Sequence, residues 1–444
     1  MIRIMKVLQI LFTICLLLTG HSVIAQELNT TKLDRYFDAL EENNKFMGSV
    51  AVSRGGELIY KRTVGYSDVE SSVKANENTK YRIGSISKTF TTILVFKAIE
   101  EGKLELDQTI KSFFPKVKHA DKITIENLLN HRSGIHSFTN DESYLEWSTE
   151  ARSRKEMIKI IVDGGSDFAP DTKAEYSNSN FVLLTYILED IYGRSYSALV
   201  KEYVADPLQL KQTYVGEELD TSKGESKSYW YKRGWELASV TDMTVPVGAG
   251  AIVSTPADLV VFSDALFSGK LISKKSLEKM MSLKDGFGMG LFTVPFGERT
   301  AYGHTGGIDG FGSVFSYFPE DNVSFAMVYN GLNYEFNAIS IAVLSAVFDQ
   351  PYDIPEFTIY DISSVDLEIY TGVYGSEQIP LKITILKEDQ GLTAQATGQS
   401  AFPLEPVDEH IFSFDPAGVV LEFNPGEKTI VLKQRGMEFQ FSKE

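Results

Sequence analysis

Residues 81–90 read Tyr-Arg-Ile-Gly-Ser-Ile-Ser-Lys-Thr-Phe and place Ser85 three positions before Lys88. In a helix, side chains at positions i and i+3 lie on one face, so the lysine amine can approach the serine hydroxyl. If the pKa of the amine is lowered, it can take the hydroxyl proton and leave a nucleophilic oxygen. Free backbone N–H groups near a helix N-terminus also favour developing negative charge. The segment therefore predicts an activated serine.

Two other serine–lysine pairs have the same spacing but a different context. Ser71–Lys74 lies in a polar, turn-like stretch, and Ser276–Lys279 lies in a charged helix with no preceding glycine. Only Ser85 follows a glycine and opens a strongly apolar helix, which ends near Gly102. The apolar positions of that helix recur at a spacing of three and four: Phe90, Ile93, Leu94 and Ala98. Context therefore favours Ser85 over the other two serines.

Length and charge limit the possible classes of protein. A chain of 444 residues is long enough for a large core and for two domains or more. The formal net charge of −17 argues against electrostatic binding to nucleic acid or to an anionic membrane. A negative charge also keeps an exported protein soluble.

The N-terminus predicts a cleaved signal peptide, residues 1–25, and therefore an exported protein that is periplasmic or secreted. Arg3 and Lys6 form a basic region, residues 7–18 form a short apolar stretch, and residues 23–25 end in a small residue suited to cleavage. The apolar stretch is too short to span a membrane comfortably, so no integral span is expected after removal of the signal.

Cysteine usage excludes several kinds of chemistry. The only cysteine, Cys15, lies inside the predicted signal peptide. The mature chain then has no disulfide, no thiol nucleophile and no cysteine-bound zinc. His131 and His136 are five positions apart without a second cluster of ligands, so no metal site and no cofactor are expected.

The order of predicted elements favours an α+β fold. We expect a helix over 33–44, a β-hairpin over 49–60 and a long helical and loop-rich middle from about 124 to 265. Strands are predicted to return at 288–294, 304–306, 312–318 and 323–329. Because strands flank the helical part in the sequence, those from both ends are expected to form one sheet.

The character of the chain changes after a proline-containing segment at 351–360, which we interpret as a linker. Beyond it, apolar residues alternate with polar ones in short runs separated by turn signals, for example at Leu381, Ile383 and Ile385. We therefore predict a main domain over 26–350 and a C-terminal domain over 361–444, the latter a small antiparallel barrel or sandwich.

Two further motifs accompany Ser85. Tyr176-Ser177-Asn178 precedes a predicted helix, where a tyrosine whose pKa is lowered by cationic neighbours can act as a general base. His304-Thr305-Gly306-Gly307 opens a strand, and its glycines let a substrate carbonyl approach the backbone. Taken singly, the motifs also fit a buried tyrosine, a helix-capping asparagine and a structural histidine.

Together and in this order, Ser-x-x-Lys, Tyr-x-Asn and His-Thr-Gly resemble the penicillin-recognising serine hydrolases, and more narrowly the class C β-lactamase-like family (peptidase family S12 type). Residues 128–135, 248–259 and 288–291 are also similar to that family, so the resemblance covers about 33–350. It implies an antiparallel sheet flanked by helices plus an all-helical subdomain. The C-terminal β segment resembles the accessory barrel often appended to such proteins.

The resemblance also implies a role for each residue of the motifs. Ser85 would be the acylated nucleophile, Lys88 would help to deprotonate it, and Tyr176 would move protons to the leaving group and from water. Asn178, His304, Thr305 and Gly306 would bind substrate. The backbone N–H groups of Ser85 and Gly307 would form the oxyanion hole, in which one donor contributes on the order of a hundredfold in rate.

His304 is the informative departure, because the true β-lactamases often have a lysine there. A histidine is largely neutral near pH 7 and supplies no fixed charge for a carboxylate. The sequence therefore predicts an exported serine hydrolase of amide or ester bonds, of the DD-peptidase, D-aminopeptidase or esterase type. Its substrate would be a small molecule, a peptide or a cell-wall fragment.

Two other functions stay open at this point: a class C-like β-lactamase, and a non-catalytic penicillin-binding or sensor protein on the same fold. The presence of Ser85, Lys88 and Tyr176 together favours an enzyme. The aromatic run at 228–231 could stack on a substrate or simply pack. The sequence leaves the substrate and the oligomeric state open.

Overall fold

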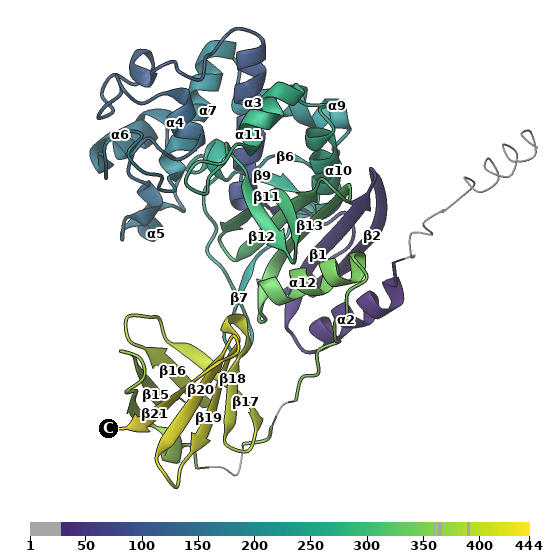
Figure 1. Ribbon diagram of the computed structural model, residues 1–444, viewed down its shortest axis with the longest axis vertical. Helices are drawn as coiled ribbons and strands as arrows, with labels where there is room; N and C mark the ends of the chain where they lie inside the picture. The colour runs from purple at the N-terminus through teal and green to yellow at the C-terminus, as the bar shows by residue number, and fades with distance from the viewer. Residues whose placement is uncertain (1–27, 359, 363–365, 389–390) are drawn as a thin grey trace, which may run out of the picture.

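The computed structural model describes residues 28–358, 360–362, 366–388 and 391–444. The predicted signal peptide, residues 1–25, with Cys15 inside it, lies outside the described residues. Figure 1 shows a larger body of sheet and helices above a small β-barrel. None of the helices in the described part combines the length and the apolarity needed to cross a bilayer.

The larger body is built on an antiparallel sheet with the strand order β10-β11-β12-β13-β1-β2. The N-terminal strand β1 pairs with the late strand β13, with Ala51 opposite Ala326. The prediction that both ends of this domain form one sheet is therefore confirmed. The strands are β1 (Phe46–Arg54), β2 (Glu57–Val64), β10 (Phe292–Phe296), β11 (Arg299–Ile308), β12 (Phe311–Phe318) and β13 (Val323–Leu332).

Alternation along the central strands explains why both faces of the sheet are covered. Val50 and Val52 pack on one face with helices α2 (Thr30–Glu42) and α12 (Phe336–Val347). Ala51 points to the other face, where α3 (Ser87–Glu100) and α10 (Pro256–Phe267) lie. There Phe90 of α3 stacks on Phe262 of α10 with ring centroids 4.0 Å apart. This second core fixes α3, and with it Lys88, relative to the sheet.

A helical part lies beyond α3, at the top of Figure 1. Thr124 caps α4 in a reciprocal capping box with Asn127, which fixes the start of that helix. The helices here and beside the sheet are α4 (Ile125–Leu129), α5 (Tyr144–Trp147), α6 (Arg154–Gly164), α7 (Asn178–Tyr192), α8 (Tyr196–Val200), a π-helical turn (Lys201–Ala205), α9 (Asp206–Leu208) and α11 (Lys274–Met281). Short strands complete the body: β3 (Tyr66–Asp68), β4 (Val73–Lys74), β5 (Tyr81–Arg82), β6 (Tyr214–Val215) and β9 (Ile252–Ser254).

The aromatic run at 228–231 forms part of a hairpin of β7 (Tyr229–Tyr231) and β8 (Trp235–Leu237). Tyr229 is buried, whereas Trp230 is 54% exposed. The hairpin reaches toward the barrel (Figure 1), and at its tip Arg233 donates to the backbone oxygen of Leu392 over 3.3 Å. One residue of the run therefore packs, one faces solvent, and the hairpin links the two bodies.

The C-terminal strands close into an antiparallel barrel, as the alternation of apolar residues predicted. Each strand pairs with its neighbour in the chain, and β14 pairs with β21 to close the ring. The strands are β14 (Gly372–Gly375), β15 (Lys382–Glu388), β16 (Gly391–Ala396), β17 (Phe402–Asp408), β18 (Ile411–Phe414), β19 (Val419–Asn424), β20 (Thr429–Gln434) and β21 (Met437–Lys443). In the described part of the barrel, closure pairs each strand with a neighbour on both sides.

Candidate active site

Ser85 lies in a tight 3-10 turn, η1 (Gly84–Ile86), and not in the first turn of the α-helix, which starts at Ser87. The reason is Gly84, whose φ of +50° belongs to the left-handed region. A Cβ atom at Gly84 would also lie 2.8 Å from the backbone nitrogen of Gly307. The glycine before Ser85 therefore serves a close approach between the serine turn and strand β11.

Lys88 is fully buried, and its Nζ lies 3.0 Å from Ser85 Oγ. The same nitrogen is 2.7 Å from Asn178 Oδ1 and 2.7 Å from the backbone oxygen of Ala249. All three partners are uncharged. Burial without a compensating negative charge lowers the pKa of Lys88 well below its usual value.

Tyr176 lies beside this pair, with its ring centroid 4.9 Å from Lys88 Nζ and its hydroxyl near the side chain of Ser85. Burial raises the pKa of Tyr176, and the proximity of Ser85 opposes this only in part. The expected lowering by cationic neighbours is absent, because burial also disfavours the charged form of Lys88. The tyrosine is thus a protonated hydroxyl at rest.

Asn178 begins helix α7, and hydrogen bonds hold both its side chain and its backbone. Its Nδ2 donates to Thr139 Oγ1 over 2.9 Å, and its backbone nitrogen donates to Ser137 Oγ over 3.0 Å. The side-chain oxygen Oδ1 of Asn178 therefore faces Lys88 Nζ. The residue expected to meet a substrate amide therefore also contacts the lysine.

Strand β11 presents alternate residues to opposite sides. Thr305 and Gly307 are exposed, whereas His304 is only 1% exposed and packs against Phe292 with ring centroids 4.4 Å apart. A Cβ atom at Gly306 would overlap the carbonyl oxygen of Ile83. The two glycines after Thr305 thus differ. Gly306 packs on the turn that carries Ser85, whereas Gly307 is exposed to solvent.

His304 is neutral at physiological pH. Burial, followed by the proximity of Lys88, lowers the pKa of His304 to about 3, against a smaller opposing effect of its hydrogen bond. That bond joins Nδ1 to the carbonyl oxygen of Thr305 over 2.5 Å, so Nδ1 carries the hydrogen. Among the described residues, none offers a hydrogen bond to the buried Nε2. A second proton would therefore have no partner.

Sequence reasoning missed a buried ion pair next to the site. Arg82, three residues before Ser85, donates from Nη1 to Asp309 Oδ2 over 3.0 Å and to the backbone oxygen of Thr241 over 2.7 Å. Asp309, two residues after Gly307, accepts from the backbone nitrogen of Thr241 over 2.9 Å. Arg82 stood in the quoted segment, but its partner is 227 residues away, so no local pattern could show the pair.

His131 was also missed, since the sequence analysis considered it only as a metal ligand and rejected that role. It is buried, its ring lies 4.4 Å from the ring of Tyr176, and its Nδ1 accepts from the backbone nitrogen of Ser177 over 3.2 Å. Burial, and then the nearby Lys88 and His304, lower the pKa of His131 well below 6.5. His136 points elsewhere, to Asp167 and Asp141. His131 therefore packs against the ring of Tyr176 and holds the backbone of the next residue, Ser177.

Comparison with known proteins shows to which family the chain belongs. Residues 33–347 match the family model described as Beta-lactamase. Penicillin-binding protein 4* of Bacillus subtilis strain 168 is 26% identical over 441 residues, which cover 91% of this chain and 97% of that protein. Teichoic acid D-alanine hydrolase of Staphylococcus aureus strain MRSA252 is 26% identical over 306 residues, covering 67% of this chain and 73% of that protein.

Solved structures of other proteins have a similar fold. The D-amino acid amidase from Ochrobactrum anthropi SV3, complexed with L-phenylalanine, superposes with a TM-score of 0.65 at 26% identity, covering 73% of this chain and 99% of that one. Because the family match spans more than half of the chain, the protein belongs to the β-lactamase family. Within that family it is a serine hydrolase.

Proposed function

We propose that the protein is an exported hydrolase that cleaves amide or ester bonds through an acyl-enzyme on Ser85, with Lys88 as the base. The hydrogen-bond geometry of Lys88 carries this proposal. A neutral amine has two N–H donors and one lone pair. Asn178 Oδ1 and the carbonyl of Ala249 can only accept, so they take both hydrogens. The lone pair is then left for the hydroxyl of Ser85, 3.0 Å away.

The remaining groups take complementary roles in this mechanism. When Lys88 accepts the proton, Ser85 Oγ attacks the carbonyl carbon, and the backbone N–H groups of Ser85 and Gly307 stabilise the oxyanion. Tyr176, protonated and next to Ser85, donates a proton to the leaving group. Water then attacks the acyl-enzyme and gives a proton to the Tyr176 oxygen, while Lys88 returns its proton to Ser85 Oγ as the acid leaves. Thr305, which is exposed on β11, would contact the substrate.

Labelling at Ser85 tests the acyl-enzyme. Intact-mass measurement after treatment with a fluorophosphonate probe is expected to show one adduct on the wild type and none on Ser85→Ala. Ser71→Ala and Ser276→Ala, which alter the other two serine–lysine pairs, are the matched controls and should label fully. An adduct that persists on Ser85→Ala would overturn the assignment, and failure of the wild type to label would favour a non-catalytic protein.

We assign the substrate class to D-aminoacyl amides or esters, with a peptide or a cell-wall fragment as the larger form. The relatives that support this are named as a D-amino acid amidase and a teichoic acid D-alanine hydrolase. Neutral His304 offers no fixed charge to a β-lactam carboxylate, so a dedicated β-lactamase is the weaker second candidate.

Steady-state kinetics separate the two candidates. We expect D-phenylalanine amide or a D-alanyl ester to be turned over faster than its L-enantiomer and much faster than a chromogenic cephalosporin. A kcat/KM for the cephalosporin on the order of 10⁷ M⁻¹s⁻¹, near the upper range for enzymes, would reverse the ranking. Export is the remaining part of the proposal, and it rests on residues 1–25. N-terminal sequencing of the protein recovered outside the cytoplasm should begin at Gln26.

A further inference from the structure

The barrel is packed at one end and hollow at the other. At the packed end, the ring of Tyr370 contacts those of Phe412 and Phe423 edge-on, with centroids 5.2 Å and 4.9 Å away. At the other end, where strands β15, β17 and β19 begin, the interior opens into a cavity of about 430 Å³. An eight-stranded barrel is wide enough to be filled by side chains or to hold one small ligand. In this barrel, side chains fill one end, and the other end has room for a small ligand.

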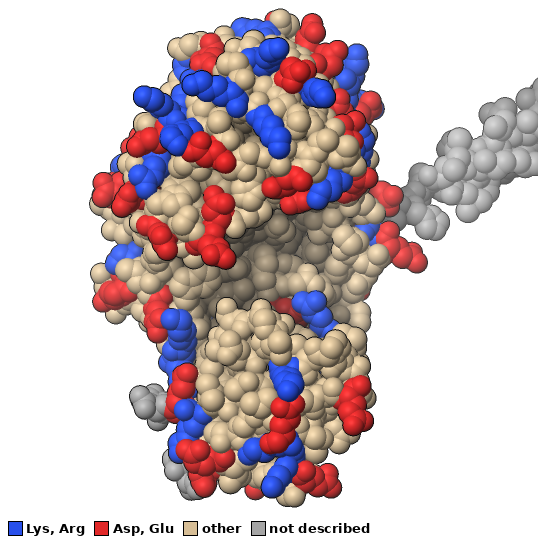
Figure 2. Space-filling view, turned by 90° about the vertical axis from the view of Figure 1, so that its left-hand side faces the viewer, with Lys and Arg blue, Asp and Glu red and all other residues tan. Residues whose placement is uncertain are grey.

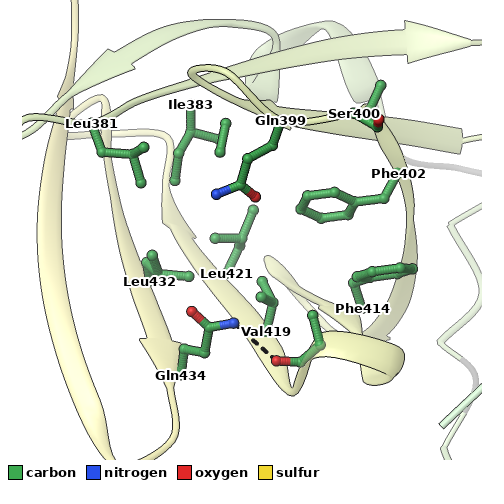
Figure 3. A pocket seen from close by; sticks show the side chains of 13 residues that line it. Leu381, Ile383, Gln399, Ser400, Phe402, Phe414, Val419, Leu421, Leu432 and Gln434 are labelled. Atoms are coloured by element: carbon green, nitrogen blue, oxygen red, sulfur yellow. Dashed lines mark hydrogen bonds between the residues drawn. The ribbon is translucent and has the colours of Figure 1, made fainter. Parts of the chain in front are cut away.

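The inner wall of the cavity is apolar and buried, whereas Gln399, Ser400 and Ala401 at its mouth are exposed. Val419, Leu421 and Leu432 line it and are at most 7% exposed. Phe402 and Phe414 form one side, with stacked rings 4.5 Å apart at an angle of 24° (Figure 3). Of the described residues that line the cavity, none is charged. An occupant that carries a full charge would therefore be desolvated without a counter-ion.

Two glutamine amides supply the polar contacts. Gln434 donates from Nε2 to the backbone oxygen of Ala417 over 2.9 Å, which fixes its amide and leaves Oε1 as an acceptor. Figure 3 shows the amide of Gln399 reaching from the β16–β17 turn over the apolar wall. An amide both donates and accepts, so the pair suits a ligand with an amide or hydroxyl group.

We propose that the open end of the barrel binds one small, uncharged and mainly apolar molecule, whose amide or hydroxyl group is held by Gln399 and Gln434. The cavity volume lies within the range of about 300 to 1,000 Å³ that is usual for small-molecule sites. The lining residues all belong to the barrel, so this site is separate from Ser85 and the proposal does not depend on the catalytic mechanism.

Fluorescence titration of the full chain with N-phenyl-1-naphthylamine, an uncharged aromatic probe, tests the proposal. We expect saturable binding of one probe per chain. Ala396→Phe, at an inward position that is 8% exposed, should fill the cavity and weaken binding at least about tenfold, as for a site closed to its ligand. Leu386→Phe is the matched control, since this barrel residue is 51% exposed and should leave binding unchanged.

Competition distinguishes the chemistry of the occupant. Decanamide and decanol should displace the probe at lower concentrations than decanoate, because the cavity has no counter-ion for a carboxylate. Gln434→Leu should remove the advantage of decanamide over a plain hydrocarbon without abolishing probe binding. Equal or better competition by decanoate would overturn the assignment of an uncharged ligand.

Two further measurements keep the site distinct from the catalytic one. Protein already labelled on Ser85 by the fluorophosphonate should bind the probe as before; loss of binding would place the probe in the active site and overturn the proposal. Circular dichroism and thermal melting check that Ala396→Phe folds, and Val419→Phe on another wall serves if it does not. Absence of saturable binding, or equal binding by the cavity-filled and control variants, would also overturn the proposal.

Discussion

Arg82 and Asp309 are buried charges that approach the candidate oxyanion hole from its two sides. Their side chains are 3% and 2% exposed, and both are also tied to the backbone of Thr241. Arg82 precedes the turn that carries Ser85, and Asp309 follows Gly307 on the next loop. Because catalysis by fixed N–H donors depends on their exact placement before the reaction, we regard this pair as a positioning unit for the two donors.

Asp309→Asn should therefore lower kcat more than it changes KM. Asparagine keeps the acceptor for Thr241 but removes the charge that holds Arg82. We expect a loss of about ten- to a hundredfold in kcat, below the full effect of deleting one oxyanion donor. Affinity for a phosphonate transition-state analogue should fall in parallel, a readout that a merely structural role would not move.

Asp321→Asn is the control for Asp309→Asn, because it breaks the partly exposed Arg299–Asp321 pair at the start of β11. Surface pairs of this kind contribute about 0–1 kcal/mol, so neither kcat nor stability should change much. Unchanged kcat in a destabilised Asp309→Asn variant would assign the buried pair to stability alone.

His304 predicts a specific dependence of stability on pH. A histidine in the unfolded chain has a pKa of about 6.5, whereas in the folded protein the pKa of His304 is lowered to about 3. Below about pH 6.5 the unfolded state therefore binds a proton that the folded state refuses, and stability is lost as the pH falls toward 3. Above pH 6.5 this contribution is complete.

His304→Gln should make that pH dependence shallower. Between about pH 6 and pH 4 we expect the slope of the unfolding free energy to fall by up to about 1.4 kcal/mol per pH unit, the limit for one proton. His131, whose pKa is lowered for the same reason, stays in place and keeps part of the slope. Denaturant unfolding at several pH values measures the slope, and identical slopes in both proteins would show that His304 is protonated in the folded state.

At the scale of elements, the site depends on strand β11 lying directly against turn η1. Gly306 has no room for a side chain, because a Cβ atom would overlap the carbonyl of Ile83 and crowd Ser313 Oγ. The same serine donates to that carbonyl over 2.8 Å. For Gly307, the next residue, the nearest non-adjacent atom of the described chain to its Cβ position is the carbonyl oxygen of Phe311, 4.0 Å away. A side chain is therefore excluded by packing at Gly306 but not at Gly307.

Gly306→Ala should push β11 away from the serine turn, whereas Gly307→Ala should not. Overpacking of this kind typically costs about 1–3 kcal/mol, so we expect a lower melting temperature for Gly306→Ala and a nearly unchanged one for Gly307→Ala. Thermal melting by circular dichroism compares the two. Equal melting temperatures would mean that the strand can move without loss of packing.

The contrast between elements and contacts shows what the sequence could supply. The hairpin of β1 and β2, the cap at Thr124 and the alternation in the barrel are local signals, and each was predictable. The 3-10 turn at Ser85 was not predictable. The left-handed backbone of Gly84 lies against strand β11, which is more than 200 residues away in the sequence. The burial of His304 and the partners of Arg82 are likewise tertiary. The residues of the site were predictable from motifs, but their protonation states were not.

At the scale of the whole molecule, the two bodies meet through a few polar contacts, and one of them surrounds Lys45. Lys45 is 5% exposed, and its Nζ lies 2.6 Å from Glu405 and 3.0 Å from Asp415 of the barrel. Burial acts to lower the pKa of Lys45, but Asp415 and Glu405 together outweigh it and raise the pKa. Figure 2 shows a hollow between the bodies, with charges of both signs scattered over each. Contacts of this kind are typical of domains that fold independently.

A chain ending near Ile354 should therefore fold and still be acylated at Ser85. Every motif of the site lies before residue 308, and Lys45 regains water when its barrel partners are removed. We expect labelling by a fluorophosphonate within about threefold of the rate of the full chain, as for domains with a modest interface. Some stability should be lost, since Phe357, which packs on Tyr334, is removed with the barrel.

The full-length double variant Glu405→Gln/Asp415→Asn separates loss of the Lys45 contact from loss of the whole barrel. It keeps the barrel but removes both charges that face Lys45, and it should resemble the shortened chain in labelling rate. If the shortened chain is folded by circular dichroism yet cannot be acylated, while the double variant is acylated normally, then the barrel itself completes the active site. The boundary that we propose at 351–360 would then divide the sequence but not the function.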